Sequence, residues 1–163
     1  MESSSPVGRA VVVLTAVVAL VFLVAAGASL SAAPQAQVNV KLNGTMQPTG
    51  DVLGDLLMRI SPDSRRVVYV ADAQTENAFE LYSAPTTGQA PPVRLSGLLP
   101  SGALVNRIAI TPDSRRVVYV APQETSGVSE LFVVPIEGGP SLKLNGPLVA
   151  GGDVDRISLS PDW

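Results

Sequence analysis

The feature that most constrains the fold is an internal repeat of about 50 residues. The segment ISPDSRRVVYVA at residues 60–71 returns as ITPDSRRVVYVA at residues 110–121. The segment ELYSAP at residues 80–85 returns as ELFVVP at residues 130–135, with the same displacement of 50 residues. A third copy begins at Leu142 and reaches Pro161, which lies 49 residues after Pro112. The chain is therefore expected to repeat one supersecondary unit along its length.

Each unit predicts four short β-strands and no helix. The RVVYVA segment is rich in β-branched and aromatic residues, as strands are, and the prolines around it disfavour a helix. A leading fourth strand is expected over residues 38–42. The strands expected in the units are residues 58–60, 66–71, 80–85 and 93–95 in the first, residues 107–110, 116–121, 130–135 and 142–144 in the second, and residues 156–159 in the third.

A tight Ser/Thr-Pro-Asp-Ser turn is predicted between the first and second strands of each unit. Proline presets the first central position of such a turn, and the aspartate beside it can accept hydrogen bonds from local backbone N–H groups. These residues are therefore assigned a structural role. The turn residues are Pro62, Asp63, Pro112, Asp113, Pro161 and Asp162.

The pattern of apolar residues in the second strand distinguishes a β-propeller from a β-sandwich with solvent-exposed faces. Val67, Tyr69 and Ala71 point to one face of the strand, and Val68 and Val70 point to the other. Both faces are apolar, whereas a strand with one solvent-exposed face alternates apolar and polar residues. Each sheet should therefore lie between two like sheets. Four strands per unit at this period favour the radial stacking of a β-propeller.

The repeated unit resembles the WD40-like repeat called PD40, which builds the β-propeller of TolB and of prolyl oligopeptidase and dipeptidyl peptidase IV relatives. The resemblance covers residues 38–163. It implies a ring of roughly six to eight blades, of which this chain would supply two blades and an incomplete third. We therefore expect a fragment of a longer propeller. The family more often has glycine after Pro-Asp, so Ser64 and Ser114 predict a turn without a positive φ. Tyr69 and Tyr119 are expected to pack between blades.

The N-terminal segment differs from the repeats. Residues 10–33 contain no charge and follow Arg9, a pattern typical of an export signal or of an apolar helix that crosses a membrane. A buried core helix is the weakest of the three alternatives, because the segment has no polar face. Either of the first two places the repeats outside the cytoplasm, in a periplasmic or extracellular location. The expected domains are 1–36, a signal peptide or anchor with a short linker, and 37–163, the repeats, divided as 37–95, 96–144 and a truncated 145–163.

The amino-acid composition excludes several kinds of catalytic and metal-binding site. The sequence contains no His and no Cys, which removes His-based catalysis, thiol nucleophiles and Cys/His zinc sites. It also lacks the G-x-S-x-G motif of serine hydrolases. The net charge is −3, which disfavours nucleic acid as a partner. We therefore predict no catalytic residue, no cofactor and no metal.

The function that these observations favour is non-catalytic protein binding or an envelope scaffold. The alternative is the propeller part of a prolyl oligopeptidase-like or dipeptidyl peptidase IV-like serine peptidase that lacks its catalytic domain, and a degenerate fragment without a function is a third possibility. The expected partners are a protein, a membrane if the leader stays uncleaved, and further copies through open blade faces. The Asp-Ser-Arg-Arg clusters at residues 63–66 and 113–116 suggest either a binding rim or solubilising edge charges.

Overall fold

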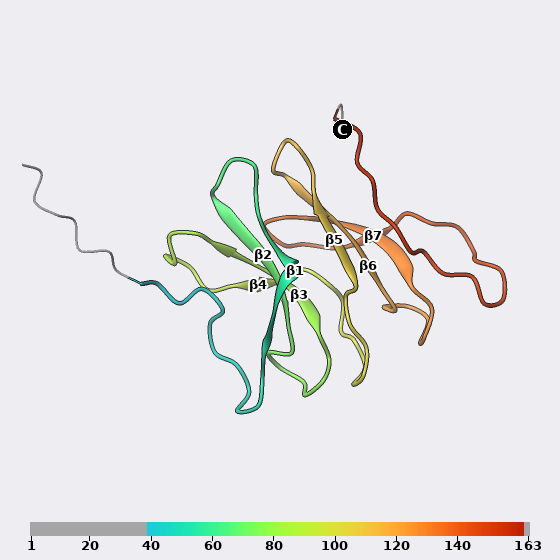
Figure 1. Cartoon of the computed structure of the whole chain (residues 1–163), viewed down its shortest axis with the longest axis horizontal. Helices are drawn as coiled ribbons and strands as arrows, with labels where there is room; N and C mark the ends of the chain where they lie inside the picture. Colours follow the sequence, from blue (N-terminus) through green and yellow to red (C-terminus); the bar gives the residue numbers. More distant parts are fainter. Residues whose placement is uncertain (1–38, 162–163) are drawn as a thin grey trace, which may run out of the picture. The chain divides into compact units, whose positions relative to one another are not determined.

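The computed structural model describes residues 39–161, which form an all-β structure of two antiparallel sheets without a helix (Figure 1). The predicted helix over residues 10–33 lies outside the described residues. Each sheet has four strands in sequence order, β1-β2-β3-β4 and β5-β6-β7-β8. The strands are β1 (Val52–Ile60), β2 (Arg66–Ala71), β3 (Glu80–Pro85), β4 (Val93–Arg94), β5 (Arg107–Ile110), β6 (Arg116–Ala121), β7 (Glu130–Pro135) and β8 (Leu142–Lys143).

The central strands form because β-branched and aromatic side chains meet across each hairpin. Tyr69 in β2 lies opposite Tyr82 in β3, with ring centroids 5.7 Å apart. Tyr119 in β6 lies opposite Phe132 in β7 in the same way, with centroids 5.4 Å apart. Such aromatic pairs contribute about 0.5–1.5 kcal/mol beyond the area they bury. The repeated sequence thus gives the same register in both sheets.

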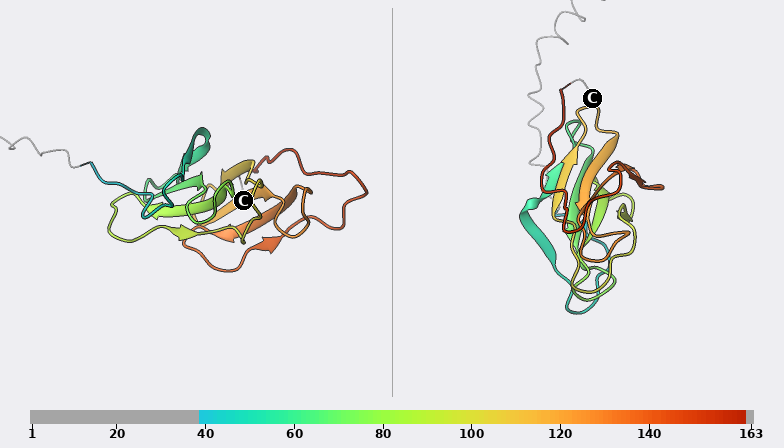
Figure 2. Two further views of the ribbon diagram at one scale, coloured as in Figure 1. Left: turned by 90° about the horizontal axis from the view of Figure 1, so that it is seen from below. Right: turned by 90° about the vertical axis from the view of Figure 1, so that its right-hand side faces the viewer.

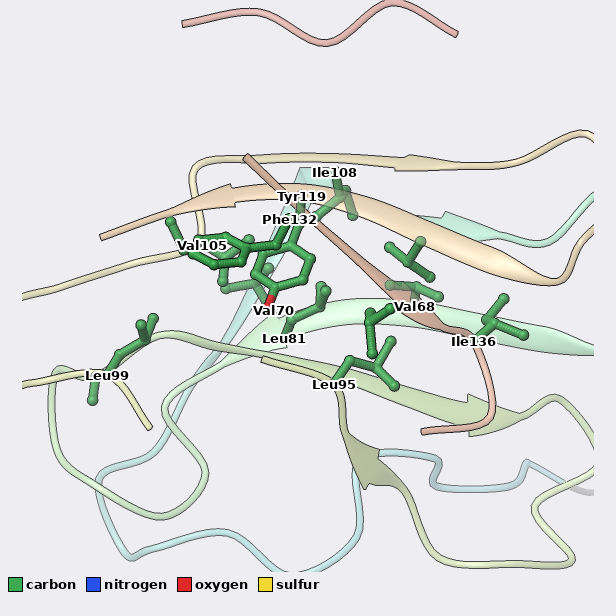
Figure 3. Packing of buried hydrophobic residues seen from close by; sticks show 14 residues of the cluster. Val68, Val70, Leu81, Leu95, Leu99, Val105, Ile108, Tyr119, Phe132 and Ile136 are labelled. Carbon is green, nitrogen blue, oxygen red and sulfur yellow. The ribbon is translucent and has the colours of Figure 1, made fainter. Parts of the chain in front are cut away.

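The two sheets lie face to face, with one apolar cluster between them (Figures 1 and 2). Val68, Val70 and Leu81 of the first sheet pack in this cluster with Tyr119 and Phe132 of the second (Figure 3). Phe132 is 1% exposed and the other four residues are fully buried. The prediction that both faces of the central strand are covered is confirmed for β2 and β6.

The other face of the first sheet carries a second apolar cluster. Tyr69 and Tyr82 lie there, together with Leu42 and Met46 from the segment before β1. Tyr119 does pack between the sheets, as expected, but Tyr69 packs beneath this leading segment. The sequence match between KLNG at residues 41–44 and RLSG at residues 94–97 makes Leu42 the equivalent of Leu95, which covers the same face of the second sheet.

The outer edge of the second sheet stays partly open. Leu142 is 65% exposed and Leu144 is 40% exposed, whereas Leu95, the equivalent of Leu144, is 2% exposed because the second sheet covers it. Within residues 39–161, no sheet covers these two leucines as the second sheet covers Leu95.

Two predicted strands are wrong. Residues 156–159 and residues 39–42 form no strand, and Val38 lies outside the described residues. A first strand needs a second strand beside it, as β5 has β6, and the sequence contains only two copies of RVVYVA. Residues 39–42 likewise have no preceding strand to pair with among the described residues. Each isolated segment therefore has strand-like sequence without the partner that a strand requires.

The strand β1 is longer than the predicted residues 58–60 and contains an irregularity. Leu53 pairs with Val70, and the next pair is Met58 with Tyr69, so residues 54–57 are left out of the ladder. Such a bulge locally disrupts the pairing and bends the strand. The second sheet has no such bulge, because β5 pairs with β6 in continuous register.

Candidate binding groove at the repeat turns

The Ser/Thr-Pro-Asp-Ser segments form tight turns at the same end of both sheets. The N–H of Ser64 donates to the carbonyl oxygen of Ser61 over 2.8 Å, and the N–H of Ser114 donates to that of Thr111 over 2.9 Å. Pro62, Asp63, Pro112 and Asp113 occupy the central positions. Pro161 also lies in a turn, and Asp162 lies outside the described residues.

The aspartate of each turn holds the turn together. Asp63 Oδ1 accepts hydrogen bonds from Ser61 Oγ over 2.6 Å and from the N–H of Arg65 over 3.1 Å. Asp113 Oδ1 accepts equivalent bonds from Thr111 Oγ1 and from the N–H of Arg115. The hydroxyl bond first and the backbone bond second lower the pKa of both carboxyls, so both are ionised at neutral pH.

The backbone conformation of the serine that follows each aspartate differs from the prediction. Ser64 has φ 61° and Ser114 has φ 62°, although serine here was expected to avoid a positive φ. The turn must rejoin the ladder quickly, since the N–H of Ser61 already donates to the carbonyl oxygen of Arg66. A residue in the left-handed region makes this reversal, as in hairpins where a turn is followed by such a residue.

The serine hydroxyl also links the two repeats. Ser114 Oγ accepts a hydrogen bond from the N–H of Asp63, 51 residues earlier, over 3.0 Å. Ser114 is 9% exposed, whereas Ser64 is exposed and its Oγ has no such partner among residues 39–161. Glycine could adopt the same φ but could not make this bond between the sheets.

A groove of about 880 Å³ lies where the two turns meet. Arg65, Arg66 and Arg115 line it together with both turn aspartates, and Pro85, Pro135 and the buried Ile136 contribute apolar surface. We call this space the turn groove. The two Asp-Ser-Arg-Arg clusters singled out in the sequence are therefore brought together at one site.

The arginines of the turn groove differ in how they are held. Arg66 Nε donates to Ser83 Oγ over 2.8 Å. Arg65 and Arg115 make no ion pair within 4 Å in the part of the chain that the structure describes. Their guanidinium groups are exposed and keep donors that no described residue uses. The groove can therefore supply charged hydrogen-bond donors to a ligand.

The sequence analysis did not single out the buried glutamates that begin β3 and β7. Glu80 is 1% exposed and lies 3.3 Å from Arg94, and Glu130 is 3% exposed and pairs with Lys143. Burial alone would raise the pKa of Glu130, but the hydrogen bond and charge of Lys143 outweigh burial and lower it. Each glutamate is the first residue of the repeated E-L-Y/F segment. Its recurrence at the same position of both repeats is the sequence feature that could have identified it.

These carboxylates do not form a site for other chemistry. Each glutamate is bound by a cation from the neighbouring strand, as a structural ion pair is. Among residues 39–161, no group of three or more Asp and Glu side chains could hold a metal ion. The same residues contain no helix long and apolar enough to cross a membrane. In the turn groove, by contrast, Arg65 and Arg115 make no ion pair with a described residue.

Comparison with known proteins does not assign the chain to a family. No protein-family model matches the sequence, and no curated protein matches it. The PD40 and TolB resemblance therefore remains a prediction from the repeated residues.

Proposed function

We propose that the chain is a non-catalytic segment of a TolB-like β-propeller that lies outside the cytoplasm and binds another protein. The observation that carries this proposal is the face-to-face packing of two four-stranded repeat units. The cluster between the sheets joins Val68 and Leu81 of one repeat to Tyr119 and Phe132 of the next. Successive units that pack in this way are the basis of a propeller.

Protein binding is supported by the unequal burial of equivalent residues. Leu144 is 40% exposed and Leu142 is 65% exposed, while Leu95 is 2% exposed in the first repeat. Leu142 and Leu144 line the same hollow. Large exposed apolar side chains that lie together favour a protein contact there. A location outside the cytoplasm is supported by the apolar residues 10–33.

Site-specific photocrosslinking in cells tests the binding proposal. A photoreactive amino acid at position 142 should yield a discrete crosslinked protein. The same residue at the exposed position Thr125 serves as the matched control and should yield none. Equal, diffuse labelling from both positions would contradict the proposal.

A reporter fusion tests the location separately. The reporter is alkaline phosphatase fused after Trp163. This enzyme becomes active only outside the cytoplasm. We expect activity from the full chain and none after residues 10–33 are deleted. Activity that is absent from the full chain would overturn the proposed location.

A further inference from the structure

We propose that the turn groove binds an extended acidic segment of a partner protein, with Arg65, Arg66 and Arg115 contacting its carboxylates. This inference rests on the proposed protein-binding function and adds the chemistry of the segment that is bound. It concerns a surface separate from Leu142 and Leu144, which do not line the groove.

The distribution of charge favours an acidic ligand at this place. The two turns carry Arg65, Arg66, Arg115 and Arg116, four of the eleven basic residues in the chain. The same turns carry two of the fourteen acidic residues, Asp63 and Asp113, so their net charge is +2. The rest of the chain has seven basic and twelve acidic residues, a net charge of −5, and one of these acids, Glu137, also lines the groove. An acidic molecule thus concentrates its cations at the turns, and local charge steers an oppositely charged partner there.

Arg65 and Arg115 keep unused donors, whereas one oxygen of each turn aspartate is used within its own turn. Arg94, Arg107 and Lys143 all form ion pairs with carboxylates elsewhere in the molecule. Arg65 and Arg115 form none with the described residues. Asp63 and Asp113 direct Oδ1 into their own turns, so these carboxylates hold the loops in shape. Arginine binds carboxylates through two parallel hydrogen bonds, which a free guanidinium can make.

The backbone places Arg65 and Arg115 before any ligand arrives. The carbonyl oxygen of Arg65 accepts the N–H of Thr86 over 2.9 Å, and that of Arg115 accepts the N–H of Ile136 over 2.8 Å. The bond between Ser114 and Asp63 then fixes one turn against the other. The backbones of the two arginines are therefore held at equivalent positions before binding, so no loop has to be ordered when a ligand arrives.

Fluorescence anisotropy with the full chain tests the inference. The probe is a fluorescein-labelled decapeptide of alternating Glu and Ser, and its matched control replaces every Glu with Gln. We expect binding of the Glu peptide alone, with an affinity that falls as salt is added. The double variant R65Q/R115Q should weaken binding by about tenfold or more. R65K/R115K should retain part of the affinity, because it keeps the charge but loses the paired hydrogen bonds.

The control variant R107Q/R156Q removes two exposed arginines outside the groove and should change binding less than about twofold. Circular dichroism checks that each variant is folded. Equal binding of the Gln peptide, or equal binding by R65Q/R115Q, would overturn the inference. Binding to vesicles of anionic lipid without binding to the peptide would also overturn it. If the Glu peptide does not bind but position 142 still yields its discrete crosslink, the proposed function stands and only the groove inference fails.

Discussion

At the scale of single residues, the most informative positions are the two serines with a positive φ. Ser64 and Ser114 have the same backbone conformation and the same sequence context, but only Ser114 Oγ accepts a hydrogen bond from the other repeat. An L-residue in the left-handed region costs about 1–2 kcal/mol. A comparison of the two positions therefore distinguishes the free-energy cost of the backbone strain from the contribution of the hydrogen bond between the sheets.

Substitution of these serines by glycine should give different results. S64G should raise the free energy of unfolding by about 0.5 kcal/mol, because glycine relieves the strain while adding some chain entropy. S114G relieves the same strain but loses a hydrogen bond of about 1 kcal/mol, so its stability should fall below that of S64G by about that amount. Urea unfolding measures both. Equal stabilisation by the two variants would mean that the bond contributes nothing.

The buried glutamate of β7 predicts a dependence of stability on pH. The pKa of Glu130 is lower than in the unfolded chain, so its charge stabilises the fold above the unfolded pKa of about 4.3. This contribution is lost as the pH falls through the lower folded pKa. The difference in urea midpoint between the chain and E130Q should therefore be largest near neutral pH and should shrink as the pH falls below about 4.3.

E124Q is the control for this measurement. Glu124 also contacts Lys143, but its side chain is 53% exposed, so its removal should change the midpoint little. A difference between the chain and E130Q that stays constant with pH would contradict the role given to the ion pair.

At the scale of strands, the aromatic pair of β6 and β7 carries the packing between the sheets. F132A removes a side chain that is 1% exposed and leaves a cavity beside Tyr119, which should cost about 3–5 kcal/mol. L142A removes a side chain that is 65% exposed and should cost far less. Chemical unfolding compares the two variants. If F132A and L142A lowered the free energy of unfolding by similar amounts, Phe132 would not belong to the core that holds the sheets together.

The sequence predicted the central strands well, because the two copies of RVVYVA and E-L-Y/F mark them twice. It failed where a strand depends on a neighbour: residues 156–159 have strand-like sequence, but within residues 39–161 no second strand lies beside them. It also missed the φ of Ser64 and Ser114, because the need to rejoin the ladder at Arg66 and Arg116 outweighs the preference of serine. The convergence of Arg65 and Arg115 on one groove depends on how the sheets pack and could not be read from local sequence.

At the scale of the whole described unit, the account holds that the two sheets stabilise each other. Val68 and Val70 of the first sheet are buried in the same cluster as Tyr119 and Phe132 of the second. Neither face would be covered if the sheets separated, and exposed apolar area is unfavourable by roughly 25 cal/mol per Å². The sheets should therefore unfold in one transition.

Hydrogen exchange measured by mass spectrometry on the full chain, with and without F132A, tests this claim most directly. The account predicts that the substitution in β7 lowers the protection of β2 in the other sheet as well as that of β6. If β2 keeps its full protection while β6 loses it, the sheets fold independently, and the face-to-face packing that supports the proposed function would be contradicted.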